Sequence, residues 1–236
     1  MPINAEDQQR QTIRRLFTRI ATEYDRINRV LSLGQDLRWR KAALAETQLS
    51  SGGRLLDVAT GTGDMVLLAS SLWPGALVVG ADLTPAMLDV ARRKAGEQVL
   101  ALAVCDGLRL AFADNTYDAV TSAFLMRNVP DVGQALREQQ RVTRPGGRVV
   151  CLEMTWPQRR LISTLFGLYF FSIPPLIGRL VGQSEAYQYL PRSVRGFLSP
   201  SALAQEMEKA GLREVRWSLR MAGSVAIHVG VKPQLP

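Results

Sequence analysis

The sequence predicts an α/β fold with a mostly parallel sheet, helices on both of its faces and a terminal antiparallel hairpin. From residue 54 onward, short apolar runs alternate with segments of helical periodicity, and this order is typical of a parallel sheet covered on both faces. The last two apolar runs are separated only by a short turn, which indicates an antiparallel pair. The 236 residues are 47% hydrophobic, enough to bury the core of one large domain.

Each element follows from its own local pattern. Apolar runs bounded by polar or glycine-containing turns predict five parallel strands at 54–59, 76–82, 99–104, 117–124 and 148–154. Helices are expected at 65–73, 84–95, 132–142 and 198–212. Thr84 and Ser199 are expected as N-caps, each followed by a proline at the first helical position. Strands at 214–221 and 224–232 complete the sheet.

Residues 8–24 are expected to form one amphipathic helix. Apolar side chains recur there at spacings of three and four, and the opposite face is rich in arginine. Such a helix either lies on an anionic membrane surface or packs on the domain as an ordinary surface helix. The pattern leaves both interpretations open.

A second segment, from Leu161 to Gly178, contains no charged residue and just reaches the length of a membrane span. Pro174 and Pro175 are expected to break it, and a broken backbone in lipid would leave polar groups unpaired. We therefore expect a hydrophobic cap over an apolar substrate, touching a membrane, rather than a transmembrane helix. The alternative is a buried core helix.

The composition limits the compartment and the partners. The formal net charge of +8, with many arginines in the first forty residues, attracts either nucleic acid or anionic lipid. Cys105 and Cys151 both lie in apolar, strand-like runs, which indicates a reducing compartment. The N-terminus shows no apolar signal-peptide core, so a cytoplasmic location is expected.

The stretch LLDVATGTGD at 55–64 predicts a nucleotide-type cofactor site. A buried strand runs into a turn with Gly61 and Gly63, and a helix follows. Asp82 ends the second strand, twenty-one residues after Gly61, where an acid can bind both ribose hydroxyls of an adenosine. Strand, glycine turn, helix and acid at this spacing together indicate an adenosine site.

The charges around the turn favour S-adenosylmethionine over NAD or ATP. Asp57 and Asp64 flank the turn, and two carboxylates would repel a pyrophosphate but attract an ammonium or a sulfonium. The third glycine of the dinucleotide pattern is absent because residue 66 is Val66, and the loop has no phosphate-binding lysine. Asp64 at the start of a helix can also stabilise its first turn, and the two roles are compatible.

Further site residues are expected at the ends of the third and fourth strands, because ligands bind outside the carboxyl ends. Asp106 is placed to accept from the adenine amino group, with Gly107 giving the ring room, and residues 123–128 should border the methyl group and its acceptor. The loop at 123–128 lacks the Asn/Asp-Pro-Pro-aromatic motif common in enzymes that methylate exocyclic amines of bases. Methylation of cytosine C5 needs a nucleophilic cysteine, and neither Cys105 nor Cys151 looks catalytic, so no nucleic-acid partner is expected. An RNA methyltransferase remains the rival that the basic charge suggests.

Five segments resemble the quinone-biosynthesis C-methyltransferases: YDRINRVLSLGQDLRWR at 24–40, LLDVATGTGD at 55–64, DAVTSAFLMRNVPD at 118–131, PGGRVVCLEMTWP at 145–157 and SEAYQYLPRSVRGFLSP at 184–200. The resemblance covers nearly the whole chain. It implies a class I methyltransferase, Rossmann-like seven-stranded fold and one domain over 1–236, with a helical lid at 1–50 and an apolar cap at 156–198.

The same resemblance implies that S-adenosylmethionine methylates a polyprenylated quinol, foremost demethylmenaquinol, with a ubiquinone-precursor benzoquinol as the alternative. It also implies peripheral contact with the inner face of the membrane. A homodimer and a complex of quinone-biosynthesis enzymes are both left open as assemblies. No metal site is expected.

Fourteen site residues follow from the motifs and the resemblance. The expected catalytic residues are Arg127, Asn128 and Tyr24, and the expected cofactor-binding residues are Asp57, Thr60, Gly61, Thr62, Gly63, Asp64, Asp82, Leu83, Asp106, Gly107 and Ala123. Many relatives carry serine where this chain has Ala123, which removes a side-chain contact to the cofactor.

Asn28 and Tyr187 are expected beside Tyr24 in the acceptor pocket. The alternative for Arg127 is a structural ion pair with Asp131 or Asp118. The single histidine, His228, is expected to be structural.

Overall fold

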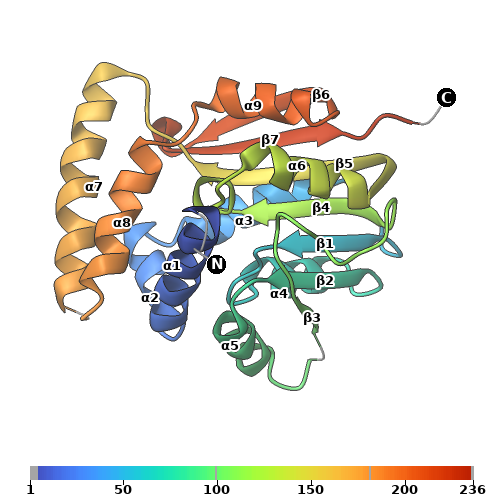
Figure 1. The fold of residues 1–236 in the computed structure, drawn as a ribbon, viewed down its shortest axis with the longest axis horizontal. Helices are drawn as coiled ribbons and strands as arrows, with labels where there is room; N and C mark the ends of the chain where they lie inside the picture. Colours follow the sequence, from blue (N-terminus) through green and yellow to red (C-terminus); the bar gives the residue numbers. More distant parts are fainter. Residues whose placement is uncertain (1–4, 99, 181, 235–236) are drawn as a thin grey trace.

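The computed structural model, which describes residues 5–98, 100–180 and 182–234, has a seven-stranded sheet at its centre (Figure 1). The strands are β1 (Arg54–Val58), β2 (Leu77–Asp82), β3 (Ala101–Val104), β4 (Tyr117–Ala123), β5 (Thr143–Met154), β6 (Arg213–Arg220) and β7 (Val225–Val231). Their order is β3-β2-β1-β4-β5-β7-β6. β1 to β5 pair in parallel, whereas β7 is antiparallel to both β5 and β6. The predicted mostly parallel sheet with a terminal antiparallel hairpin is therefore confirmed.

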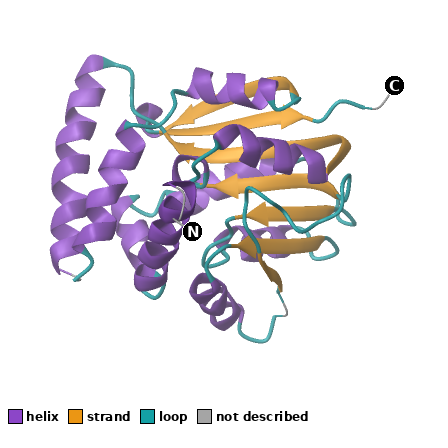
Figure 2. Ribbon diagram, viewed as in Figure 1, coloured by secondary structure: helices purple, strands orange, loops and turns teal. Residues whose placement is uncertain are grey.

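Helices cover both faces of the sheet, as expected from alternating buried side chains (Figure 2). On one face Leu56 and its strand neighbours pack against α6 (Val132–Val142) and α9 (Pro200–Lys209). On the other face Leu55 packs against α3 (Asp36–Glu46) and α4 (Asp64–Leu72). Neighbouring residues of one strand thus enter different cores, because successive side chains of a strand point to opposite faces. Helix α5 (Pro85–Ala95) lies beside β2 and β3.

The parallel strands point towards a group of helices at one end of the sheet (Figure 1). This group comprises α1 (Ala5–Ile20), α2 (Tyr24–Leu31), α7 (Arg160–Leu180) and α8 (Ser184–Arg195). The expected helix over 8–24 ends earlier, at Ile20, where a turn closed by the Glu23 N–H on the Ile20 carbonyl (3.1 Å) starts α2. A third small core, which includes Ile20, Ile27 and Tyr187, joins these helices to α5.

Helix α7 runs without interruption through Pro174 and Pro175, so the predicted break is wrong. Each proline removes only one backbone donor, and packing against α8 holds the following turn in place. The approach is close: a Cβ on Gly178 would lie 2.7 Å from the Cβ of Tyr187. By length and composition, residues 160–179 could cross a membrane. Only 17% of that apolar window is buried, which also argues against a buried core helix.

Candidate active site

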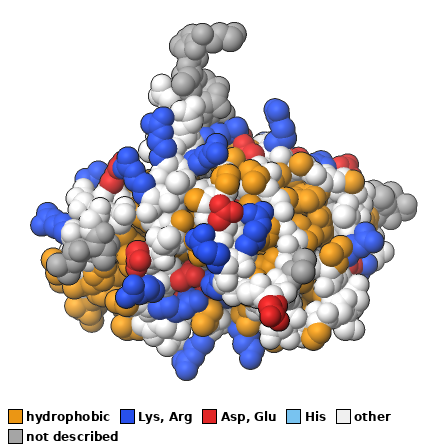
Figure 3. Space-filling model, turned by 90° about the horizontal axis from the view of Figure 1, so that it is seen from below, with side chains coloured by type: hydrophobic (Ala, Val, Ile, Leu, Met, Phe, Trp, Pro, Cys, Tyr) orange, Lys and Arg blue, Asp and Glu red, His pale blue; other side chains and the backbone are white. Residues whose placement is uncertain are grey.

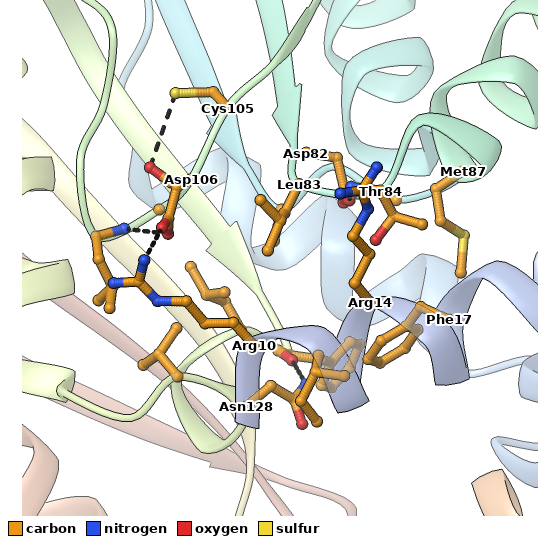
Figure 4. Close-up of a pocket in the computed structure, with 18 of the residues that line it drawn as sticks. Arg10, Arg14, Phe17, Asp82, Leu83, Thr84, Met87, Cys105, Asp106 and Asn128 are labelled. Atoms are coloured by element: carbon orange, nitrogen blue, oxygen red, sulfur yellow. Dashed lines mark hydrogen bonds and ion pairs between the residues drawn. The ribbon is translucent and has the colours of Figure 1, made fainter. Parts of the chain in front are cut away.

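A pocket of about 810 Å³, its open mouth included, lies at the carboxyl ends of the parallel strands, within the size range of small-molecule sites. We call it the strand-end pocket. Its lining combines the ends of β1 to β4 with the lid helix α1, and it includes Arg10, Arg14, Phe17, Tyr24, Gly61, Asp82, Leu83, Met87, Asp106, Gly107, Ala123, Phe124 and Asn128. Figure 4 shows Arg10, Arg14 and Phe17 reaching from α1 into this space, opposite Asp82 and Asp106.

Asp82 organises the floor of the strand-end pocket. One carboxylate oxygen accepts from the Gly61 N–H and the other from the Thr84 N–H, both at 2.8 Å. Burial raises the pKa of Asp82, and these two hydrogen bonds oppose the rise. Gly61 has a φ of +56°, and a Cβ there would meet nothing within 4 Å. The turn therefore presents bare backbone to the pocket beside a carboxylate whose position is fixed.

Asp106 lies at the far end of the strand-end pocket, after β3. It accepts from the Leu108 N–H at 2.9 Å and forms an ion pair with Arg10 at 2.9 Å (Figure 4). A Cβ on Gly107 would already touch Val58 and Leu125 at 3.4 and 3.5 Å. The lid helix thus closes over this part of the pocket through an ion pair. Because Gly107 has no side chain, the opposite wall of the pocket leaves more room there.

Asp64 is held by cations instead of lining the pocket. Its carboxylate pairs with Arg29 at 2.8 Å and with Lys94, and Arg40 lies 3.9 Å away. Burial would raise the pKa of Asp64, but Arg40 and Lys94 outweigh it and lower the pKa. Thr62 next to it donates to Asp25 of α2 at 2.5 Å. These two residues of the glycine turn therefore bind the lid helices to the sheet.

Asp57 and Gly63 serve packing. Asp57 is buried in β1, accepts from the Thr121 hydroxyl at 2.8 Å, and has its pKa raised to about 6 by burial. Gly63 has a φ of +81°, and a Cβ there would lie 2.9 Å from the Cβ of Ala91 in α5. The second glycine is required because α5 passes so close to the turn.

A second pocket, of about 690 Å³, lies between the lid and the cap helices. We call it the lid–cap pocket. Its lining is mostly aromatic and aliphatic, and it includes Tyr24, Asn28, Leu31, Asp36, Trp39, Arg40, Phe124, Arg127, Met154, Phe166, Tyr169, Phe170, Leu190 and Met221. Tyr24 and Phe124 line both pockets, so they form the wall between them.

Polar groups gather around this wall. Arg127 forms a buried ion pair with Glu153, and its guanidinium lies 5.5 Å from the centre of the Phe124 ring. Asn128 donates to the Phe124 carbonyl at 2.9 Å and accepts from the Tyr189 hydroxyl at 3.0 Å. Phe124 itself has a φ of +61°, a strained conformation of the kind that clusters at functional sites.

The family model described as "ubiE/COQ5 methyltransferase family" matches residues 4–232. The chain belongs to this family. It is 44% identical over 234 residues to the demethylmenaquinone methyltransferase of Deinococcus radiodurans, covering 98% of this chain and 97% of that protein. It is also 41% identical to the ubiquinone/menaquinone biosynthesis C-methyltransferase UbiE of Desulfotalea psychrophila, covering 93% of this chain and 90% of that protein.

Solved structures confirm the class I methyltransferase fold of this ubiE/COQ5 family member. An S-adenosylmethionine-dependent methyltransferase from Thermotoga maritima superposes with a TM-score of 0.63 at 18% identity, covering 93% of this chain and 99% of that one. The Haemonchus contortus phosphoethanolamine N-methyltransferase 2, in complex with S-adenosylmethionine, has a TM-score of 0.62 at 18% identity, covering 83% and 52%.

The ubiE/COQ5 family member is an S-adenosylmethionine-dependent methyltransferase, and the strand-end pocket suits that cofactor. Gly61 leaves room on the turn, Asp82 supplies a buried carboxylate at the end of β2, and Asp106 supplies another after β3. No group of three or more histidine, cysteine, aspartate or glutamate residues that could hold a metal occurs in the described ranges.

Six of the eleven predicted cofactor residues line the strand-end pocket, namely Gly61, Asp82, Leu83, Asp106, Gly107 and Ala123. The other five, Asp57, Thr60, Thr62, Gly63 and Asp64, do not line it. Asp57 bonds to β4 and Thr60 to β2, Thr62 and Asp64 bond to α2, and Gly63 packs against α5. The charge argument for a sulfonium is also weakened at Asp64, since three cations surround it. Family membership, not that charge, establishes the cofactor.

Among the predicted catalytic residues, Arg127 lines the lid–cap pocket, Asn128 lines the strand-end pocket and Tyr24 lines both. The expected ion-pair partners of Arg127 are wrong. Asp131 caps α6 by accepting from the Gln134 N–H, and Asp118 pairs with Arg144.

Tyr187 lies in the core between lid and cap, not among the residues that line the acceptor side, whereas Asn28 lines the lid–cap pocket as expected. Phe124 lies in the loop 123–128 that the sequence placed at the acceptor, whereas Tyr189 and Glu153 were not predicted as site residues. For Glu153 a signal existed, since a lone carboxylate at the end of an apolar strand is costly to bury. His228 is buried in β7 and its ring donates to the Pro200 carbonyl at 2.8 Å, a structural role.

Proposed function

We propose that the enzyme methylates a ring carbon of a polyprenylated quinol, foremost demethylmenaquinol. The observation that carries this proposal is the wall of Tyr24 and Phe124, which separates the strand-end pocket from an apolar pocket beneath the exposed helix α7. The names of the relatives from Deinococcus radiodurans and Desulfotalea psychrophila support a quinone-type acceptor. A ubiquinone-precursor benzoquinol is the second candidate, because the second name includes ubiquinone biosynthesis.

In this proposal the strand-end pocket holds the methyl donor. Asp82 accepts from the ribose hydroxyls with the lone pairs that Gly61 and Thr84 leave free, and Asp106 accepts from the adenine amino group beside Gly107. Leu83 and Ala123 contribute apolar wall. Bound S-adenosylmethionine supplies an electrophilic methyl group. Arg10 and the Leu108 N–H use only part of the acceptor capacity of Asp106, so the carboxylate can accept from the adenine amino group while the Arg10 ion pair holds the lid helix over the donor.

The lid–cap pocket holds the acceptor ring in this proposal. Arg127 stabilises the phenolate oxygen that remains when the acceptor hydroxyl gives its proton to solvent, because a neighbouring guanidinium favours the phenolate. The ring carbon then bonds to the methyl carbon as the bond from sulfur to that methyl breaks, which leaves S-adenosylhomocysteine, and loss of the proton on the ring carbon to solvent restores the aromatic ring. Asn128 and Tyr24 orient the ring at the wall. The dry, aromatic lining excludes water and holds the ring close to the donor.

We further propose that the lid (1–50) and the cap (156–198) form one domain with the rest of the chain, and that α7 rests on the inner face of the cytoplasmic membrane. The side of α7 that faces the protein contributes Phe166, Tyr169 and Phe170 to the lid–cap pocket. Its outer face exposes large apolar side chains: Leu161, Leu165, Leu168, Phe171, Ile173 and Leu176. In Figure 3 hydrophobic side chains gather at the left edge, the side on which Figure 1 places α7 and α8. Contiguous exposed apolar surface of this kind is typical of membrane contact.

The substrate assignment is tested by transfer of a labelled methyl group to three acceptors, each read by mass spectrometry. We expect demethylmenaquinol to be methylated on carbon, a benzoquinol precursor to be methylated more slowly, and RNA to remain unmodified. Methylation of RNA with steep salt dependence, and none of either quinol, would overturn the proposal.

The membrane assignment is tested by flotation with vesicles that contain phosphatidylglycerol. The variant Leu165→Glu/Leu168→Glu should bind at least about 10-fold more weakly, since each apolar side chain contributes roughly 1.5–3 kcal/mol when buried. The control is Leu77→Glu, compared with Leu168→Glu alone: Leu77 is similarly exposed (50%, against 64%) but lies at the start of β2, at the other end of the sheet from α7. Equal loss in both variants would show that α7 has no special role.

A further inference from the structure

Glu153 is a buried carboxylate that neither the sequence motifs nor the pocket lining brings into the reaction. It lies near the end of β5 and is 1% exposed. An ionised side chain at such a position is costly unless it is paired and hydrogen-bonded. Its partner is the side chain of Arg127, itself 7% exposed.

Glu153 is held in one orientation by two further contacts. The oxygen that pairs with the Arg127 guanidinium also accepts from the Met154 N–H at 2.8 Å. The other oxygen lies 3.4 Å from the backbone N–H of Arg127. Because backbone and side chain bind the same carboxylate, the β4–α6 loop that carries Arg127 is tied to the end of β5.

The guanidinium of Arg127 is only partly satisfied by these contacts. Its Nε is buried and has no hydrogen-bond partner among the residues that the structure describes. Nη1 donates to Glu153 and Nε is buried, so Nη2 is the donor that a ligand oxygen in the lid–cap pocket can reach.

Phe124 restricts the plane of this guanidinium. Two guanidinium groups lie over the Phe124 ring, that of Arg127 at 5.5 Å and that of Arg40 of α3 at 5.3 Å from its centre. A cation over an aromatic ring is attracted by the electron-rich face of the ring, and more strongly when water is excluded. The plane and the rotation of the Arg127 fork are therefore restricted from two directions, one set by Phe124 and one by Glu153.

A buried ion pair is a poor way to gain stability, because desolvation offsets most of the attraction. We infer that Glu153 is a positioning residue for Arg127: it orients the guanidinium so that its remaining N–H groups meet the acceptor oxygen across the lid–cap pocket. This inference rests on the proposed function, in which Arg127 stabilises that oxygen.

The test compares Glu153→Gln with Glu138→Gln as the matched control. Glu138 also pairs with an arginine, Arg141, through two contacts of 2.8 Å, but neither residue lines either pocket. We expect Glu153→Gln to lower kcat for quinol methylation at least 10-fold while KM for S-adenosylmethionine and the affinity for S-adenosylhomocysteine stay within 2-fold. Glu138→Gln should leave kcat unchanged. Glu153→Asp, which keeps the charge, should recover part of the loss.

A binding measurement supplies a readout independent of turnover. With S-adenosylhomocysteine present, calorimetry should show at least 5-fold weaker binding of 1-naphthol to Glu153→Gln than to the wild type. In an Arg127→Gln background, Glu153→Gln should change neither kcat nor naphthol affinity by more than 2-fold, because the side chain that it positions is gone.

Three outcomes overturn the inference. One is a parallel loss of cofactor affinity and thermal stability in Glu153→Gln, as a purely structural residue would give. Another is an undiminished effect of Glu153→Gln in the Arg127→Gln background. The third is no effect of Glu153→Gln in an enzyme that methylates quinols, which leaves the proposed function intact. A wild-type enzyme that methylates no quinol removes the proposed function and this inference together.

Discussion

The strand-end pocket and the lid–cap pocket share a wall but are built differently. The strand-end pocket takes its polar groups from the ends of β2 and β3, where Asp82 and Asp106 each accept from the backbone N–H two residues further on. Asp82 also accepts from the Gly61 N–H in the turn that follows the neighbouring strand β1. The lid–cap pocket draws its lining from α2, α3, α7, α8 and the β6–β7 connection. Its main polar group, Arg127, is oriented by Glu153, twenty-six residues away in the sequence.

This difference has a consequence for recognition. In the proposed function, Asp82 and Asp106 bind the polar parts of the donor, and these carboxylates are oriented by backbone N–H groups at the edge of the sheet rather than by the helices. The lid–cap pocket instead requires lid and cap to be in place together, joined by contacts such as the Tyr169 hydroxyl on the Leu31 carbonyl at 3.0 Å. We therefore expect substitutions to separate into those that affect donor binding and those that affect turnover.

The largest effect is expected at Arg127. Arg127→Lys keeps the positive charge beside Glu153 but loses the planar fork. Turnover should fall about 10²–10³-fold, the usual effect of removing one donor to a developing oxyanion. Calorimetry should show unchanged affinity for S-adenosylhomocysteine. A larger loss of that affinity than of kcat would show that Arg127 binds the cofactor rather than the acceptor.

Asp57 tests whether a motif carboxylate belongs to the core. Burial raises its pKa from 3.8 to about 6, so the folded state retains its proton at a higher pH than the unfolded state does. Relative to Asp57→Asn, the wild type should lose roughly 2 kcal/mol of unfolding free energy as the pH rises from about 4 to 6, because the proton that stabilises the folded state is lost there. Urea titrations at pH 4, 5, 6 and 7 measure this difference.

Affinity for S-adenosylhomocysteine completes the Asp57 test. We expect Asp57→Asn to bind within about 2-fold of the wild type, because Asp57 does not line the strand-end pocket. If Asp57→Asn bound S-adenosylhomocysteine much more weakly and its stability showed no pH-dependent difference from the wild type, Asp57 would be a cofactor-binding residue after all.

Asp82→Ala should weaken S-adenosylhomocysteine binding about 10–100-fold, since it removes the ribose acceptor and leaves the Gly61 N–H unpaired. The matched control is Asp89→Ala on the exposed side of α5, where the carboxylate pairs with Arg92. Its affinity should be unchanged, and an unchanged affinity in Asp82→Ala would place the donor elsewhere.

The smallest effect separates the two glycines of the turn. Gly63→Ala should lower the free energy of unfolding by about 1–3 kcal/mol, because the new Cβ meets Ala91 and the φ is positive. Gly61→Ala meets no atom within 4 Å and should cost only about 1 kcal/mol, from its positive φ. Its methyl group should weaken donor binding instead, and equal stability losses without any loss of affinity would contradict this assignment.

The strand-end pocket could be predicted because parallel strands bring their carboxyl ends together by topology alone. Gly61, Asp82 and Asp106 each directly follow or end an apolar run, so period and spacing suffice to place them on one edge. The same reasoning failed at Asp64, because its partners Arg29, Arg40 and Lys94 come from three separate helices.

The sequence by itself therefore determined the sheet, its antiparallel end and the cofactor edge, since these depend on short-range periodicity and on turn chemistry. Only the tertiary structure decided which carboxylates line the strand-end pocket and which pair with cations, how α7 passes Pro174 and Pro175, and that Glu153 pairs with Arg127. The physical reason is that ion pairs and helix packing join residues far apart in the chain, and the periodicity of a short segment does not predict which distant residue it will contact.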